Sequence, residues 1–191
     1  MELRPIPAGD LHWLYHQRLV EDFPPEERKS FQSMERLVRL GEYDAWGLYE
    51  GRELLAYALF WVAEGREYVM LDYLAVHPSR RGQGLGSHLL AELDGKYSGC
   101  KGVLVEAEAP RPEACEAVNA LRRRRLAFYR QAGYRDLNCT AFLFGVWYTL
   151  LISGRTPAER RPAILTMHEK LYQRGAALAG KRYTQIIYEK S

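Results

Sequence analysis

A glycine-rich turn carries the clearest chemical signal of the sequence. Three glycines stand within residues 82–86, directly after Arg80 and Arg81. The apolar stretch before them has the composition of a strand, and helical spacing starts at Leu85. At such a turn, backbone N–H groups converge at the positive end of a helix, glycines admit phosphate oxygens, and arginines add charged donors. The pattern is typical of a diphosphate-binding site.

Two common nucleotide-binding motifs do not fit this turn. The P-loop ends in Gly-Lys-Ser/Thr, whereas here Leu85 and Gly86 follow Gly84. The dinucleotide motif G-x-G-x-x-G places its third glycine three residues after the second, but Gly86 comes two residues after Gly84. The turn also follows the fourth predicted strand, whereas a Rossmann fold places it after the first. A ligand with an adenosine diphosphate group remains consistent with the turn, and coenzyme A carries one.

The turn resembles the acyl-CoA motif of the GNAT superfamily of N-acetyltransferases, Arg/Gln-x-x-Gly-x-Gly/Ala. Arg81, Gly84 and Gly86 match this motif, and residues 74–78 match the aliphatic-Ala-Val-x-Pro strand ending that precedes it. A second resemblance lies in residues 126–134, where a helix carries a tyrosine just before a Gly-aromatic pair. The two motifs stand in the order of the family, with a predicted strand between them.

The resemblance covers about residues 67–135 and implies an acetyl-CoA-dependent enzyme that needs no metal and acetylates an amine acceptor. It implies a sheet that splays between strands at residues 68–76 and 102–106, with the acyl donor in the split. The donor-binding residues that it implies are Leu74, Ala75, Val76, Arg81, Gly82, Gln83, Gly84, Leu85, Gly86 and Ser87.

Tyr129 is the expected general acid. Acyl transfer from a thioester to an amine needs a neutral amine, a polarised carbonyl and a group that protonates or stabilises the departing thiolate. A tyrosine with a pKa near 10 can donate to a thiolate whose parent thiol has a pKa of about 8.5. The family assigns this role to the matching tyrosine. From composition alone Tyr129 would be interpreted as a core residue, so the assignment depends on its place before residues 132–134.

Three carboxylates are candidates for the general base. Alternation along the predicted strands places Asp72 on the same face as Leu74 and Val76, and Glu106 on the same face as Glu108. Any of the three could therefore border the splayed site. Glu106 is the preferred base, acting directly or through a water molecule.

The helix that carries the tyrosine also carries arginines. Arg125 interrupts the apolar series of this helix and could reach the sheet to pair with Glu106 or Glu108. For Glu106, the sequence supports this structural pairing and a catalytic role equally. Many members of the family have an asparagine about two turns before the tyrosine. Here Arg122 occupies that place and Asn119 lies one turn earlier. The sequence thus departs from the family pattern for the pantetheine contacts of this helix.

The elements that position these residues alternate between strands and helices. Strand patterns and turn signals predict strands at about residues 2–6, 45–49, 54–62, 68–76, 102–106, 141–152 and 182–189. Helical spacing predicts helices at about 11–23, 25–41, 85–97, 113–131 and 157–174. The expected fold is a single GNAT-type α/β (α+β) domain over residues 1–191, with a mixed, mostly antiparallel sheet flanked by helices and splayed between its fourth and fifth strands. Its expected parts are an acyl-CoA-binding core over about residues 67–135 and a C-terminal strand–helix–strand unit over 140–189.

Composition is that of a globular protein. The chain has 191 residues, of which 47% are hydrophobic and 27% charged, enough for one sizeable core. The net charge of +3 is too small to predict a nucleic-acid partner. Three cysteines without a CxxC pair suit a reducing compartment. The first residues lack a signal-peptide pattern, and the longest apolar run, residues 141–152, is too short to span a bilayer, so we expect a cytoplasmic protein without membrane contact.

Other motifs have simpler interpretations. The four arginines at 122–125 point in four directions on a helix and cannot form one basic face, which argues against nucleic-acid binding. His12 and His16 have a metal-compatible spacing, but no third ligand accompanies them. The sequence therefore predicts an N-acetyltransferase. The alternative is a catalytically silent acyl-CoA-binding module, and homodimer formation is left open.

Overall fold

The computed structural model describes residues 1–62, 64–153 and 156–190. Its strands form one eight-stranded sheet in the order β1-β2-β3-β4-β5-β7-β6-β8. Neighbouring strands are antiparallel except β4 and β5, which are parallel. The predicted mixed, mostly antiparallel sheet is confirmed. The strands are β1 (Glu2–Pro5), β2 (Tyr43–Glu50), β3 (Glu53–Val62), β4 (Tyr68–Val76), β5 (Gly102–Glu108), β6 (Tyr134–Leu143), β7 (Val146–Ser153) and β8 (Ile187–Lys190).

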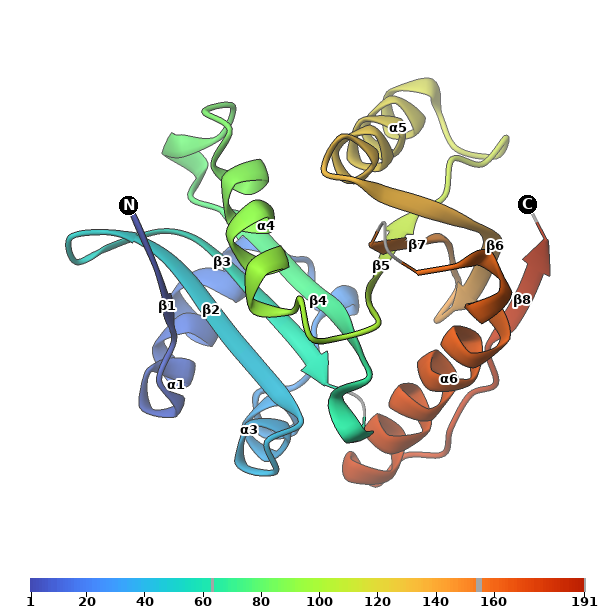
Figure 1. Cartoon of the computed structure of the whole chain (residues 1–191), viewed down its shortest axis with the longest axis horizontal. Helices are drawn as coiled ribbons and strands as arrows, with labels where there is room; N and C mark the ends of the chain where they lie inside the picture. Colours follow the sequence, from blue (N-terminus) through green and yellow to red (C-terminus); the bar gives the residue numbers. More distant parts are fainter. Residues whose placement is uncertain (63, 154–155, 191) are drawn as a thin grey trace.

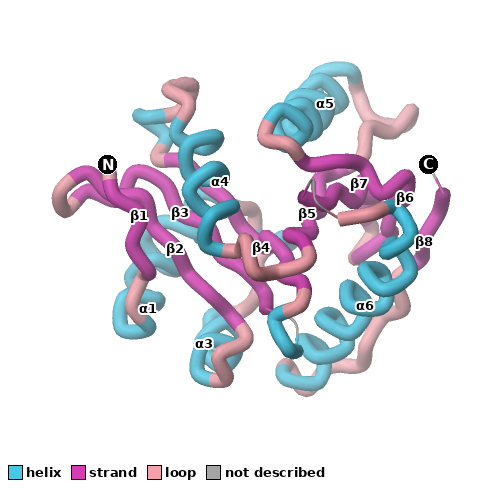
Figure 2. Tube along the Cα trace, viewed as in Figure 1, coloured by secondary structure: helices cyan, strands magenta, loops and turns pink. Residues whose placement is uncertain are grey.

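Helices cover both faces of the sheet (Figures 1 and 2). On one face lie α4 (Leu85–Lys96) and α5 (Glu116–Gln131). The opposite face is covered by α1 (Leu11–Leu14), α3 (Phe31–Arg39) and α6 (Arg161–Leu178). The chain stays helical after α1, through a π-helical segment at Tyr15–Leu19 and then α2 (Val20–Asp22).

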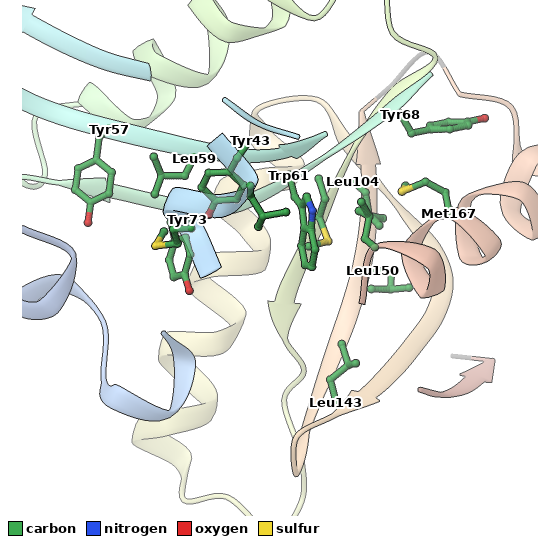
Figure 3. Close-up of a cluster of buried hydrophobic side chains, with 14 of the residues drawn as sticks. Tyr43, Tyr57, Leu59, Trp61, Tyr68, Tyr73, Leu104, Leu143, Leu150 and Met167 are labelled. Carbon is green, nitrogen blue, oxygen red and sulfur yellow. The ribbon is translucent and has the colours of Figure 1, made fainter. Parts of the chain in front are cut away.

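Each face of the sheet has its own apolar core. One core lies under α4 and α5, and the other packs against α1, α3 and α6. Figure 3 shows the second core, which extends from Tyr57 on β3 to Leu143 on β6 and includes Met167 of α6. Because helices cover both faces, β3 is buried without interruption from Leu54 to Val62. A continuous apolar run, rather than alternation, is the pattern of a strand buried on both sides.

The sheet splays between β4 and β5. Their parallel pairing runs only from Tyr68 opposite Gly102 to Leu71 opposite Val105. Directly after this point β4 contains a β-bulge, because successive residues of β3 pair with Leu71 and then with Tyr73. The extra residue is Asp72, and a bulge of this kind bends the strand and increases its twist. The two strands therefore diverge where the sequence predicts the acyl donor.

The largest differences between the predicted elements and the structure concern three segments. The run at residues 141–152 is not one strand but parts of β6 and β7, joined by a turn in which Phe144 and Gly145 have φ of 49° and 86°. The predicted helix at 25–41 begins only at Phe31, because Ser30 caps it by accepting a hydrogen bond from the Ser33 N–H. The last strand is shorter than predicted and spans Ile187–Lys190.

Candidate active site

The glycine turn forms one wall of a groove of about 590 Å³. The other walls are the end of β4 and one side of α5. Eight of the ten predicted donor-binding residues line this groove, and Ala75 and Gln83 do not. The lining consists of Leu74, Val76, Arg80, Arg81, Gly82, Gly84, Leu85, Gly86, Ser87, Arg124, Ala127, Phe128 and Gln131.

The turn can accommodate a diphosphate because of its glycines. Gly82 and Gly84 have φ of 79° and 76°, a region that residues with a Cβ rarely adopt. Gly84 is the N-cap of α4 and has no side chain, so the first N–H groups of this helix are left for an anion. A Cβ on Gly86 would lie 3.3 Å from the Phe128 ring and 3.6 Å from Val76, across the groove. A side chain there would narrow the groove.

The free edge of β4 offers backbone groups to the groove. His77 N donates to Leu55 O on β3, and in an antiparallel ladder the residues that bond to the partner strand alternate. Ala75 therefore bonds toward β3, whereas the N–H and C=O groups of Leu74 and Val76 face the splay. The side chain of Ala75 is buried in the core on the other face of the sheet. A backbone contact with the acyl donor is thus compatible with the positions of Leu74 and Val76 but not with that of Ala75.

Arg81 is bonded to the protein at two points. Its Nε donates to Val76 O over 3.2 Å, and its Nη2 donates to Asp22 Oδ1 over 3.0 Å. The Asp22 side chain is buried and also accepts a hydrogen bond from the Tyr57 hydroxyl over 3.2 Å. The guanidinium is thus held beside the glycine turn, where it adds positive charge to the groove.

Tyr129 lies next to the groove but does not line it. Its neighbour Phe128 does, and the two rings are 5.0 Å apart between centroids. Burial raises the pKa of Tyr129 to about 12, although the nearby charge of Arg125 lowers it in part. None of the described residues forms a hydrogen bond with its hydroxyl. The proton therefore stays on the oxygen at neutral pH and is not committed to another group of the described chain.

Glu106 lies on the opposite face of the sheet from Tyr129. Its Oε1 is 2.6 Å from His168 Nε2, and its Oε2 accepts a hydrogen bond from the Tyr172 hydroxyl over 2.7 Å. Burial raises the pKa of Glu106, but the His168 imidazole, the two hydrogen bonds and the charge of Lys29 together hold this pKa below its ordinary value. The carboxyl is therefore ionised at neutral pH. Sequence reasoning missed His168 and Tyr172, because they follow Glu106 by more than 60 residues and have no motif around them.

The arginines of α5 pair with Glu108. Arg122 Nε donates to Glu108 Oε2 over 2.7 Å, and Arg125 Nη1 lies 3.8 Å from Oε1. The interpretation that Arg125 pairs with Glu106 or Glu108 is confirmed for Glu108, whereas Glu106 has other partners. Asn119 has a structural role, because its amide accepts a hydrogen bond from Arg111 N and donates to Arg111 O. It thereby fixes the loop before α5.

Asp72 points away from the groove. Lys29 Nζ lies 2.6 Å and 2.8 Å from its two carboxylate oxygens, and Tyr43 donates a further hydrogen bond. Leu74 and Val76, in contrast, line the groove on the other face. The prediction that Asp72 shares their face is wrong, because the bulge at Asp72 inserts one residue and shifts the alternation.

A loop between α2 and α3 is tied to β4 near this carboxylate. The Tyr73 hydroxyl accepts from Lys29 N over 2.8 Å and donates to Glu27 O over 2.9 Å. The Tyr15 hydroxyl donates to Lys29 O over 2.9 Å. Lys29 Nζ also lies 4.4 Å from the centroid of the Trp61 ring, a cation–π distance. The loop is therefore fixed on the face of the sheet that carries Glu106.

A protein metal site needs several ligand side chains close together. Within residues 1–62, 64–153 and 156–190, no three His, Cys, Asp or Glu side chains are grouped in this way. Of the helices in this part of the chain, none is both long enough and apolar enough to cross a membrane.

Comparison with known proteins gives concordant results. The family model described as "Acetyltransferase (GNAT) domain" matches residues 41–136. The "Putative acetyltransferase YjbC" of Bacillus subtilis (strain 168) is 28% identical over 180 residues, which are 93% of this chain and 88% of that protein. The structure is similar to a "putative acetyltransferase from GNAT family" of Bacteroides thetaiotaomicron, with a TM-score of 0.66, 21% identity and coverage of 95% of this chain and 100% of the other. It is also similar to Arabidopsis thaliana NAA60 in complex with acetyl-CoA, with a TM-score of 0.57, 18% identity and coverage of 79% and 96%.

Proposed function

Since this chain belongs to the GNAT family of acyl-CoA-dependent acetyltransferases, we propose that it transfers the acetyl group of acetyl-CoA to a primary amine. The observation that carries this proposal is the placement of Tyr129 and Glu106 on opposite faces of the sheet where β4 and β5 diverge. A thioester in the split would have a proton donor on one side and a carboxylate on the other. We propose further that residues 1–191 act as a single domain in the cytoplasm.

The groove would hold the donor. The N–H groups of Leu85, Gly86 and Ser87 in the first turn of α4 would bind the diphosphate, with Arg81 adding a charged donor. The backbone groups of Leu74 and Val76 would bind the pantetheine arm as an additional strand binds a sheet edge. These contacts would direct the thioester into the split between β4 and β5.

Tyr129 would act on the leaving group. The lone pair of the neutral amine attacks the thioester carbon, the C–S bond breaks, and the nitrogen loses a proton to water as the amide forms. The thiolate sulfur receives a proton from the Tyr129 hydroxyl, which then regains a proton from water. Because the pKa of Tyr129 is raised to about 12, this hydroxyl stabilises the departing sulfur first as a hydrogen-bond donor. The proton follows as negative charge develops on sulfur.

Glu106 would act on the acceptor. Most primary amines arrive as ammonium ions, which must lose a proton before they attack. Asp72 is paired with Lys29 and Glu108 with Arg122, whereas Glu106 is held by His168 and Tyr172. Its ionised carboxylate would attract the ammonium group and accept its proton directly or through water, acting as the general base.

Calorimetric titration of acetyl-CoA into the purified protein, followed by release of free CoA on a panel of amines, tests the proposal. The panel contains spermidine, lysine methyl ester, 2-phenylethylamine and a short peptide with a free N-terminus. Saturable binding with amine-dependent CoA release supports the proposed reaction. Binding without release on any amine would favour a catalytically silent acyl-CoA-binding module, and absence of binding would contradict both.

A further inference from the structure

His168 is fully buried on α6, yet both of its ring nitrogens have polar partners. Nε2 lies 2.6 Å from Glu106 Oε1, and Nδ1 lies 2.9 Å from the hydroxyl of Tyr188 on β8. A buried polar group without partners costs several kcal/mol, so this arrangement fixes the ring in one orientation. The imidazole therefore links the C-terminal strand to the carboxylate on β5.

The partners of His168 determine where its protons lie. An ionised carboxylate only accepts hydrogen bonds, so Nε2 must carry a hydrogen that points at Glu106. In the neutral ring, Nδ1 then accepts a hydrogen bond from the Tyr188 hydroxyl. In the charged ring, Nδ1 donates to the Tyr188 oxygen, and the hydroxyl hydrogen can turn to Leu165 O, which lies 3.3 Å away. Both protonation states of His168 keep their hydrogen bonds, and in both of them the ring donates to Glu106.

Other charged and titratable groups also face Glu106. Besides His168, α6 contributes Tyr172, whose own pKa is raised by burial and then by the charge of Glu106. The α2–α3 loop contributes Lys29, which favours the ionised carboxylate. From β7 comes Tyr148, whose pKa is raised by burial and by nearby carboxylates, Glu106 first among them. Lys29 is in turn paired with Asp72 of β4. Of all the groups that act on Glu106, His168 stabilises its ionised form most.

We propose that His168 is a positioning residue for the acceptor side of the reaction: its Nε2 hydrogen bond holds the Glu106 carboxylate in place beside the point where β4 and β5 diverge. This inference rests on the proposed role of Glu106. His168, Tyr172 and Tyr188 all lie outside residues 41–136, the part of the chain that matches the family model. The C-terminal helix and strand would thus complete the site rather than only extend the sheet.

Two substitutions separate this role from simple core packing. His168→Gln keeps an N–H donor that can reach Glu106, whereas His168→Leu fills the space without one. Tyr188→Phe leaves His168 in place and removes only the partner of Nδ1. This variant can therefore replace the other two in the measurements if they fold poorly. Thermal unfolding establishes which variants are folded before the comparison.

The first measurement is NMR of the full-length protein and needs no substrate. With 15N-histidine, the His168 signals, identified by their loss in His168→Leu, should show a hydrogen on Nε2. With 13C-labelled glutamate carboxyls, the Glu106 signal, identified by its loss in Glu106→Gln, should titrate at higher pH in His168→Leu than in wild type. The difference from wild type should be smaller in His168→Gln. A hydrogen on Nδ1 alone, or the same Glu106 titration in wild type, His168→Leu and Tyr188→Phe, would overturn the inference.

The second measurement is the pH dependence of kcat/KM with the most active amine of the panel. In His168→Leu the acid limb should move to higher pH while the affinity for acetyl-CoA stays unchanged. At a pH below the limb, kcat/KM should fall about tenfold for every pH unit by which the limb moves. His168→Gln should recover most of the loss. An unchanged acid limb in His168→Leu would contradict the positioning role. If the wild type itself acetylates no amine, the proposed function fails, while the NMR titration still decides whether His168 controls Glu106.

Discussion

The Arg81 guanidinium donates a hydrogen bond to the buried carboxylate of Asp22 over 3.0 Å and so joins the glycine turn to the end of α2. Asp22 also accepts from the Tyr57 hydroxyl, and Arg18 lies 3.9 Å away. The positive charge beside the groove is therefore anchored to the N-terminal helices. This arrangement orients Arg81 before any donor binds, which lowers the entropy lost on binding.

Replacement of Arg81 should weaken acetyl-CoA binding. Arg81→Ala removes a charged donor from the groove, and we expect an affinity loss of about tenfold, or about 1.4 kcal/mol. Arg81→Glu should lose more, because the new charge would repel both the diphosphate and Asp22. Arg39→Ala is the control for net charge, since Arg39 pairs with Glu35 on the exposed side of α3. Calorimetry measures the acetyl-CoA affinity of all three variants. Equal affinities for Arg81→Ala and Arg39→Ala would exclude a contact between Arg81 and acetyl-CoA.

Removal of the Tyr129 hydroxyl should affect turnover without affecting binding. General acid catalysis contributes about 10²- to 10⁴-fold, so Tyr129→Phe should lower kcat within that range at an unchanged Kd for acetyl-CoA. The matched control is Tyr134→Phe, because Tyr134 is a buried tyrosine whose ring centroid is 5.8 Å from that of Tyr129. Turnover by Tyr129→Phe equal to that of Tyr134→Phe would remove Tyr129 from the mechanism.

The raised pKa of Tyr129 gives a separate prediction on pH dependence. With a pKa of about 12, the hydroxyl keeps its proton throughout the neutral and mildly basic range. Deprotonation of Tyr129 should therefore cause no loss of kcat between about pH 7 and 10. A basic limb in this range that disappears in Tyr129→Phe would show that the hydroxyl titrates there and that burial does not hold its proton.

Local sequence patterns predicted the glycine turn and most strands and helices, because each depends on residues close together in the chain. The splay between β4 and β5 was expected because these patterns resemble those of the GNAT superfamily. Asp72 was placed on the wrong face because one bulge residue reverses the alternation of a strand, and nothing in the sequence around it marks a bulge. The turn at Phe144 and Gly145 did have a signal, namely a glycine within an apolar run.

The partners of Glu106 could not be found in this way. His168 and Tyr172 reach it only because α6 returns to the face of the sheet that carries Glu106, and this return depends on the tertiary packing of α6. In the sequence around α6, the network is represented only by two polar residues, His168 and Tyr172, which stand one helical turn apart beside apolar neighbours. Such a pair is equally compatible with an exposed helix surface, so the pattern has no predictive value by itself.

The ion pair between Lys29 and Asp72 should stabilise the fold mainly by preventing an uncompensated charge. The Asp72 side chain is 8% exposed and that of Lys29 is 20% exposed. Among the described residues, Lys29→Met would leave the buried Asp72 with the Tyr43 hydroxyl as its one remaining partner, and we expect a loss of about 3 kcal/mol in the free energy of unfolding. The double variant with Asp72→Asn should lose less than the sum of the single variants. Urea unfolding measures the cycle, and additive losses would show that the pair is not coupled.

Gly175 tests whether the packing of α6 supports the site. A Cβ at Gly175 would lie 2.5 Å from Cη2 of Trp61, which is fully buried and contacts Lys29 and Tyr172. Gly175→Ala should therefore displace α6 and destabilise the protein by about 1–3 kcal/mol. In contrast, Gly95→Ala on α4 meets no atom within 4 Å and should stabilise the protein by about 0.5–1 kcal/mol. Because α6 carries His168 and Tyr172, Gly175→Ala should also lower kcat while acetyl-CoA affinity is retained. Full turnover by a destabilised Gly175→Ala variant would show that the site tolerates displacement of this helix.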